Sequence, residues 1–291
     1  MVLKKEKHLE HYKVWRRYMR NFGNLKLWCH LTLDSDEKFT NKEIRESVPI
    51  KVYSFRDLVQ IVARISYHNP DYSLFYRGQG RDFKLAAGSS SFYPTIFRKK
   101  RGSLFKKELD GRFDILKQCT DELFKSLHSK DVEGISKLNK FPELLWSILQ
   151  HYEVCGTPLL DVTHSLRAAA SFAFLSGTPK AYLFIFGVPY PRGTITYSVE
   201  QELLTIKLIS ACPSDALRPH FQEGYLIGTF PSRAERKLPQ LDFGRRLIAK
   251  IELDKKGFWD NDFPKMPKNS LYPEDDYIED ICKEIRSKYV S

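Results

Sequence analysis

Residues 157–175 read TPLLDVTHSLRAAASFAFL, and this stretch decides the fold. It begins with turn residues and continues as a short apolar run that contains Asp161 and Thr163. Ser165 is a favourable N-cap for the helix expected over residues 166–175. That helix is rich in alanine, so its backbone is able to pack close to a sheet. The stretch therefore predicts a turn, a short apolar run and a helix that lies against a sheet.

Apolar spacing on either side of this stretch predicts a mixture of strands and helices. Residues 72–77 alternate into aromatic residues and end at Gly78, which is typical of a strand. Further strands are expected at residues 181–188, 203–210, 225–230 and 247–253, and helices at residues 55–65, 104–127, 142–152 and 278–285. Because these elements follow no regular strand–helix–strand period, the sequence predicts an α+β fold with a central mixed or antiparallel sheet and flanking helices.

Composition limits the class of protein. The chain has 291 residues, of which 42% are hydrophobic and 29% charged, so disorder and coiled coil are excluded as its main character. The 47 Lys and Arg residues exceed the 36 Asp and Glu residues, and the net charge of +11 favours a polyanionic partner. We predict a basic helical extension at residues 1–50, with Leu9, Tyr12 and Trp15 at helical spacing, and an α+β domain at residues 51–291.

The sequence also indicates a compartment. No apolar run approaches the roughly 18 residues that a membrane span needs. The N-terminus has basic residues but lacks the apolar segment of a secretory signal. The 5 cysteines are widely spaced and form no zinc-binding pattern. We therefore expect a cytoplasmic protein with free thiols, no membrane contact and no metal.

Two polar segments carry the first candidate residues. In Tyr76-Arg77-Gly78-Gln79, an arginine at a strand end is able to present its planar guanidinium to a phosphate or carboxylate. An arginine at a strand end is also common as an ordinary salt-bridge residue. The second segment runs from His151 and Tyr152, at a helix end, to Asp161, Thr163 and Ser165, where a helix N-terminus offers an anion site. Turn, cap and helix-end roles are the alternative for these residues.

A third polar segment lies at residues 218–225. Arg218, Gln222 and Glu223 are candidates for a hydrogen bond to a ribose or for a general base. If residues 222 and 223 alternate along a strand, only one of the two faces a cleft. An exposed polar loop is the alternative interpretation.

Taken in order, these segments resemble the FRG domain family over residues 54–289. The family is named for a Phe-Arg-Gly motif, which reads Tyr76-Arg77-Gly78 here. Its second signature, His-Tyr-Gly followed by Pro-Thr-x-Leu-Leu-Asp-Trp-Thr, corresponds to residues 151–153 and 157–163, where the Pro-Thr arrangement is altered and Val162 stands in place of the usual tryptophan. Its third signature is matched by Arg218 and residues 222–225. Glu153 stands where the family usually has glycine.

The order of the motifs is also similar to that of ADP-ribosyltransferase-like folds, which have a split sheet. This resemblance implies that NAD is a co-substrate, that Arg77 holds its diphosphate, and that Gln222 or Glu223 lies near the bond to be broken. His151 is expected to act with these catalytic residues. It further implies that the following residues bind substrate: Tyr76, Gly78, Gln79, Tyr152, Asp161, Thr163, Ser165 and Arg218.

The role that this resemblance implies is an ADP-ribosyltransferase or NAD glycohydrolase that modifies a macromolecule, either a protein or a nucleic acid. Enzymes of this kind act as bacterial toxins or phage-defence effectors, which implies a cognate antitoxin or defence partner. The main alternative is a nucleic-acid-binding or RNA-processing protein that uses its basic surface, with Arg98, Lys99, Lys100 and Arg101 as contacts. A non-catalytic module that recognises a nucleotide is a third interpretation.

Overall fold

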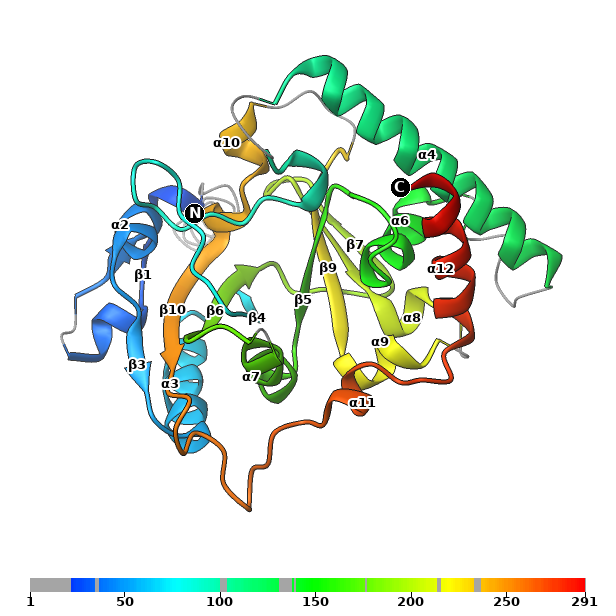
Figure 1. Cartoon of the computed structure of the whole chain (residues 1–291). Coiled ribbons are helices and arrows are strands. Elements are labelled where there is room, and N and C mark those ends of the chain that lie inside the picture. The colour runs from blue at the N-terminus through cyan, green and yellow to red at the C-terminus, as the bar shows by residue number, and fades with distance from the viewer. Residues whose placement is uncertain are drawn as a thin grey trace, which may run out of the picture.

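An eight-stranded sheet runs through the middle of the molecule, as the computed structural model shows (Figure 1). Its strand order is β3-β10-β6-β4-β5-β9-β8-β7. Only β3 and β10 are parallel, and every other neighbouring pair is antiparallel. The strands are β3 (Ile50–Val52), β4 (Ser73–Gln79), β5 (Leu159–Thr163), β6 (Ala181–Val188), β7 (Ile195–Ser198), β8 (Leu203–Lys207), β9 (Gly224–Thr229) and β10 (Leu247–Leu253). The mixed α+β fold expected from the sequence is confirmed.

The structure describes residues 22–34, 37–99, 104–130, 138, 140–175, 177–213, 216–232 and 237–290. The helix expected around Leu9 to Trp15 lies outside these ranges. Residues 22–50 contain a small separate sheet of β1 (Lys26–Leu27) and β2 (Phe39–Thr40). Within this segment, Phe22, Trp28 and Ile44 belong to the same apolar core as β4, β6 and β10. The domain boundary at residue 50 stays a prediction, but these residues do not stand apart from the sheet.

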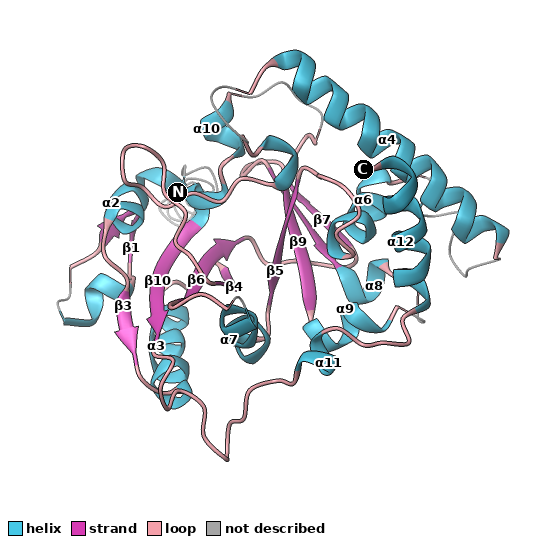
Figure 2. Ribbon diagram, viewed as in Figure 1, coloured by secondary structure: helices cyan, strands magenta, loops and turns pink. Residues whose placement is uncertain are grey.

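Helices cover the sheet in two groups (Figure 2). Helices α3 (Phe55–His68) and α7 (Leu166–Leu175) share one apolar core with β4, β6 and β10. Helices α4 (Lys106–Ser129), α6 (Pro142–His151) and α12 (Tyr277–Tyr289) share a second core with β8 and β9. The shorter helices are α2 (Asn41–Glu46), α8 (Leu208–Ala211), α9 (Leu217–Gln222), α10 (Leu238–Leu241) and α11 (Lys268–Leu271), with the 3-10 turns η1 (Phe22–Asn24), η2 (His30–Asp34), η3 (Thr95–Phe97) and η4 (Phe243–Arg246). No helix in the described ranges is long and apolar enough to cross a membrane.

Two local interpretations differ from the structure. The strand expected at residues 203–210 ends at Lys207, because the chain turns into α8 at Leu208. Residues 217–222, for which an exposed polar loop was the alternative interpretation, form the short helix α9. Its side chains pack inward, and Arg218, Pro219 and Gln222 are buried. Tertiary packing overrides the weak local preference of these short segments.

The alternation of β5 directs its side chains to two opposite faces. Leu160 and Val162 belong to the core beneath α7, whereas Leu159 belongs to the core beneath α6. Asp161 is therefore on the α6 side of the strand, as is Thr163. This alternation places the polar residues of the strand where the candidate site lies.

Gly78 allows α7 to rest directly on β4. A Cβ atom at this position would lie 1.7 Å from the backbone oxygen of Ala169 and 2.8 Å from the backbone nitrogen of Ala173. Both partners are backbone atoms, so no side-chain rotation relieves the overlap. Ala169 and Ala173 are themselves fully buried. The glycine of the Tyr-Arg-Gly motif is thus required by the close approach of helix and strand.

We expect Gly78→Ala to lower the free energy of unfolding by at least about 3 kcal/mol, since overpacking against rigid backbone is costly. Gly111 provides a matched control, because it lies within α4 and a Cβ added there would meet nothing within 4 Å. Gly111→Ala should raise the free energy of unfolding by about 0.5–1 kcal/mol, since alanine favours helix. Denaturant unfolding of both variants measures the difference. A Gly78→Ala protein as stable as the wild type would contradict the close approach.

Candidate functional site

The sheet opens between β4 and β5. These two strands share a single paired position, Tyr76 with Thr163, whereas β4 pairs with β6 along its whole length. Beyond Tyr76 the strands separate, and the guanidinium of Arg77 spans the gap. Its Nη1 donates to the backbone oxygen of Asp161 at 2.6 Å, and its Nε donates to Gln79 Oε1 at 3.2 Å. Arg77 thereby satisfies a carbonyl that has no strand partner on that side.

A cavity of about 410 Å³, here named the first cavity, lies at this opening. Its volume suits a small ligand or part of a larger one. All three motif segments reach it. The sequence-predicted residues that line it are Tyr76, Arg77, Gly78, Gln79, His151, Asp161, Thr163, Arg218 and Gln222. Residues that are distant in the chain therefore meet at one place.

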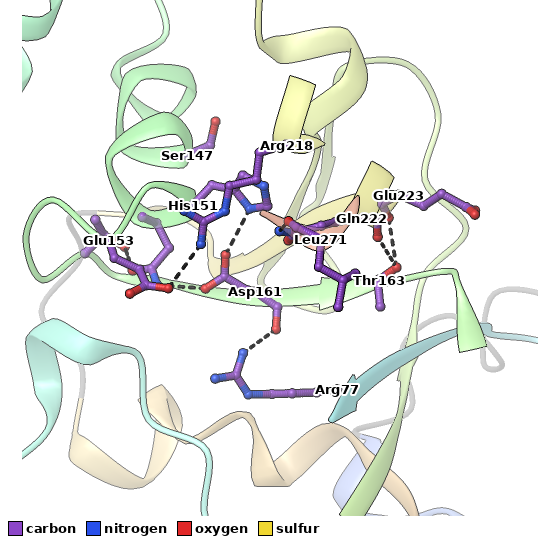
Figure 3. A network of polar contacts seen from close by, with 12 residues as sticks. Arg77, Ser147, His151, Glu153, Asp161, Thr163, Arg218, Gln222, Glu223 and Leu271 are labelled. Carbon is purple, nitrogen blue, oxygen red and sulfur yellow. Dashed lines mark hydrogen bonds and ion pairs between the residues drawn. The ribbon is translucent and has the colours of Figure 1, made fainter. Parts of the chain in front are cut away.

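Several expected residues lie elsewhere. Tyr152 is buried behind the cavity wall, and Ser165 caps α7 by accepting a hydrogen bond from the Ala168 amide at 3.4 Å. Glu223 is exposed and does not line the cavity. Figure 3 shows Gln222 turned toward Leu271 and Glu223 turned away from the cluster. Of the basic run, Arg98 and Lys99 are exposed, and Lys100 and Arg101 lie outside the described residues.

Asp161 is the centre of the polar network (Figure 3). Its Oδ2 accepts a hydrogen bond from Gln150 Nε2 at 2.7 Å, and its Oδ1 lies 3.6 Å from His151 Nδ1. Burial alone would raise the pKa of Asp161, but His151, Arg77 and Gln150 together hold this pKa below its ordinary value. Asp161 is therefore a carboxylate at neutral pH. Its side chain is 34% exposed, so the charge faces the cavity.

His151 is a buried and neutral neighbour of this carboxylate. Burial lowers its pKa, while Asp161 opposes that shift. Its Nε2 is buried and has no hydrogen-bond partner in the described part of the chain. Gly224 makes room for the ring, because a Cβ there would lie 3.3 Å from His151 Cε1. A buried ring nitrogen without a partner is uncommon and is a group that a ligand or water would satisfy.

Arg218 supplies a second cation on the opposite wall. Its guanidinium packs over the rings of Tyr272 at 4.5 Å and Tyr152 at 5.5 Å. Its Nη2 donates to Glu153 Oε1 at 3.1 Å, and its buried Nε has no partner among the described residues. Asp276 holds Tyr152 and Arg218 in place, since its Oδ2 accepts hydrogen bonds from the Tyr152 hydroxyl at 2.7 Å and from the Arg218 backbone amide at 2.9 Å.

Glu153 has a left-handed backbone, with a φ of 56°. This conformation explains why glycine is usual at the position, since a side chain there costs about 1–2 kcal/mol. Here the strained residue brings a carboxylate to the cavity, 65% exposed and beside Arg218. The departure from the family motif therefore adds a charged group to the site.

Thr163 holds the end of β5 to the end of α9. Its hydroxyl donates to the backbone oxygen of Gln222 at 2.7 Å and accepts from the Ser165 amide at 2.9 Å. The Gln222 side chain donates from Nε2 to the Leu271 carbonyl at 2.6 Å. These bonds position the third motif against the second. The structure thus assigns structural contacts to Thr163 and Ser165, for which the sequence alone allows either role.

Sequence reasoning did not place Gln150, Tyr272 or Asp276 in the site. Asp276 could have been identified from the sequence, because an aspartate before an amphipathic helix is a typical N-cap. In the structure its Oδ1 accepts a hydrogen bond from the Ile278 amide at 3.1 Å. Gln150 adjoins the motif histidine, but nothing in the local pattern shows that its amide reaches Asp161.

The fold and the first cavity together define an α+β protein with a charged cleft at an opening of its sheet. Residues 72–181 match the family model of the FRG domain, so this part of the chain is similar to that domain. That range spans β4 to the start of β6 and includes Arg77, His151 and Asp161, whereas Arg218 and Gln222 lie beyond it. No curated protein and no solved structure matches the chain.

The strain at Glu153 is testable with two variants. Both Glu153→Gln and Glu153→Gly remove the charge near Arg218, but only glycine adopts a φ of 56° without cost. We expect the glycine variant to have the larger free energy of unfolding, by about 1 kcal/mol. Urea unfolding at neutral pH gives both values. Equal stability of the two variants would show that the backbone there is not strained.

Burial of neutral His151 makes stability depend on pH. The unfolded chain takes up a proton on this residue below about pH 6.5, whereas the folded chain resists it, so stability falls as the pH drops from that value. We expect His151→Gln to lose less stability than the wild type between about pH 7 and pH 5. His128→Gln, at an exposed position, serves as the control and should keep the wild-type difference. An unchanged difference in His151→Gln would contradict a neutral buried ring.

Proposed function

We propose that the first cavity binds a nucleotide of the NAD type and breaks the glycosidic bond between its ribose and its nicotinamide. One observation carries the proposal: Arg77, Asp161, His151, Arg218 and Gln222, from separate motifs, line a single cavity. A carboxylate held between cations at an opening of a sheet suits a reaction that develops positive charge on a sugar.

In the proposed reaction the bond between ribose C1′ and the nicotinamide nitrogen breaks. Its electron pair leaves with the nitrogen, so the pyridinium becomes neutral nicotinamide. The ribose becomes oxocarbenium-like and accepts a lone pair from the attacking group, which releases a proton. The carboxylate of Asp161 stabilises the developing positive charge, because its low pKa keeps it ionised. Water as attacking group gives a glycohydrolase, and a macromolecular side chain gives a transferase.

Residue roles follow from this proposal. Arg77 binds the diphosphate, since a guanidinium holds phosphate oxygens in its planar fork. Gln222 is the member of the third motif that faces the cavity, and it takes the role near the ribose that the resemblance left between Gln222 and Glu223. The macromolecular acceptor, the toxin or defence role and a cognate partner stay predictions from the resemblance.

The proposal is tested with full-length protein and NAD labelled in its nicotinamide. We expect release of labelled nicotinamide, and a fall in kcat of about a hundredfold in Asp161→Asn, the size of effect seen when one stabilising group is removed. Arg77→Lys keeps the charge but loses the fork, and should raise KM.

Three results would count against the proposal. Neither binding nor turnover of NAD by folded wild-type protein would refute it. Full activity in Asp161→Asn together with loss of activity in Glu223→Gln would assign the carboxylate to the exposed residue instead. A steep salt-dependent binding of nucleic acid without NAD turnover would favour the nucleic-acid alternative.

A further inference from the structure

A second cavity, of about 450 Å³, adjoins the first. The two share part of their lining, because Arg77, Gln150, Glu153 and Asp161 line both. Groups bound in the two cavities would therefore both lie near Arg77. No part of the proposed glycosidic chemistry uses this second space.

Three arginines from distant elements line the second cavity. Arg77 comes from the end of β4, Arg98 follows η3, and Arg286 lies near the end of α12. Protein around the Arg98 guanidinium lowers its pKa, and the like charge of Arg77 lowers it further, whereas the charge of Asp161 opposes this shift. Convergence of like charges costs free energy unless an anion lies between them.

Within the described ranges, no carboxylate lies within ion-pair distance of these three guanidinium groups. Arg98 donates from Nε to the Tyr93 carbonyl at 2.8 Å, which holds the side chain but supplies no counter-charge. Other cations of the chain are compensated: Arg45 pairs with Asp242, and Lys51 pairs with Asp254. Three arginines therefore line the second cavity with no carboxylate in direct ion-pair contact among the described residues.

The two carboxylates of the shared wall offset this charge only in part, since burial lowers the pKa of both Arg77 and Arg98 and Asp161 opposes that shift without lying within ion-pair distance of either. Glu153 is paired with Arg218 at 3.1 Å. Asp161 is bound by Gln150 at 2.7 Å and lies beside His151. Both acidic groups therefore have partners on the side of the first cavity. An anion in the second cavity would therefore meet three arginines that have no carboxylate in direct ion-pair contact within the described ranges.

We propose that the second cavity binds the diphosphate of the nucleotide whose glycosidic bond lies in the first cavity, with Arg98 and Arg286 as phosphate-binding residues beside Arg77. The choice of a nucleotide rests on the proposed function, whereas the anion site rests on the arginines alone. Guanidinium groups bind phosphate oxygens through charge-assisted hydrogen bonds, and three such groups match a diphosphate better than a single charge. The shared Arg77 places the phosphates next to the sugar.

The proposal is tested by calorimetric titration of full-length protein with ADP, inorganic pyrophosphate and adenosine. We expect the double variant R98Q/R286Q to bind ADP and pyrophosphate at least about tenfold more weakly, since two charge-assisted contacts are lost. Adenosine binding should be unchanged. Arg192→Gln, at an exposed position that lines neither cavity, is the matched control and should bind all three ligands like the wild type.

The outcomes separate this inference from the proposed function. If NAD is not turned over but ADP or pyrophosphate binding falls in R98Q/R286Q, the phosphate site stands and the glycosidic reaction is refuted. If NAD is turned over and the double variant leaves KM and ADP affinity unchanged, the phosphate site is refuted. A short single-stranded oligonucleotide is the remaining probe. Loss of its binding in the double variant, with ADP binding unchanged, would overturn the inference by assigning the arginines to a nucleic-acid backbone.

Discussion

The backbone of α7 rests on β4 at Gly78, and the geometry of the cleft depends on this contact. Helix α7 follows β5 directly, through Thr163 and Ser165. The position of the helix on β4 therefore determines how the end of β5 lies relative to Arg77. If a side chain at residue 78 lifted the helix, the bond from Arg77 to the Asp161 carbonyl would no longer span the opening of the sheet. The close packing of these two backbones thus sets the distance between Arg77 and Asp161.

Stabilisation of the fold is a poor explanation for the polar network around Asp161. Removing a carboxylate and a guanidinium from water costs several kcal/mol for each ion, and this cost often exceeds what their pairing returns. In this cleft the compensation is incomplete, because His151 Nε2 and Arg218 Nε are buried without partners among the described residues. Glu153 adds backbone strain in the same place. Unsatisfied donors, strain and charge gathered at one cavity are typical of a binding or catalytic site.

Much of this site was predictable because its residues belong to short local motifs. Each motif can be recognised from a few neighbouring residues. Examples are an arginine near a strand end, the glycine after it and an aspartate in a short apolar run. Glu223 was less predictable, since the expected strand alternation does not apply there. Gln222 ends α9, and Glu223 takes a left-handed conformation with a φ of 45°, which turns its side chain outward. Tyr272 and Asp276 approach Arg218 from far along the chain, and spacing alone carries no information about such contacts.

The net charge of +11 says more about ligand binding once the ion pairs of the basic residues are considered. A surplus of basic residues spread over a surface is a general property, and pairs such as Lys180 with Glu252 and Lys288 with Glu122 are local and exposed. Arg77, Arg98 and Arg286 differ, because they line one cavity and none of them forms an ion pair with a carboxylate of the described ranges. Field strength at a surface depends on such uncompensated clusters more than on the total charge. The arginines of the cleft, rather than the sum over the chain, are therefore the part of the positive charge on which the proposed phosphate site rests.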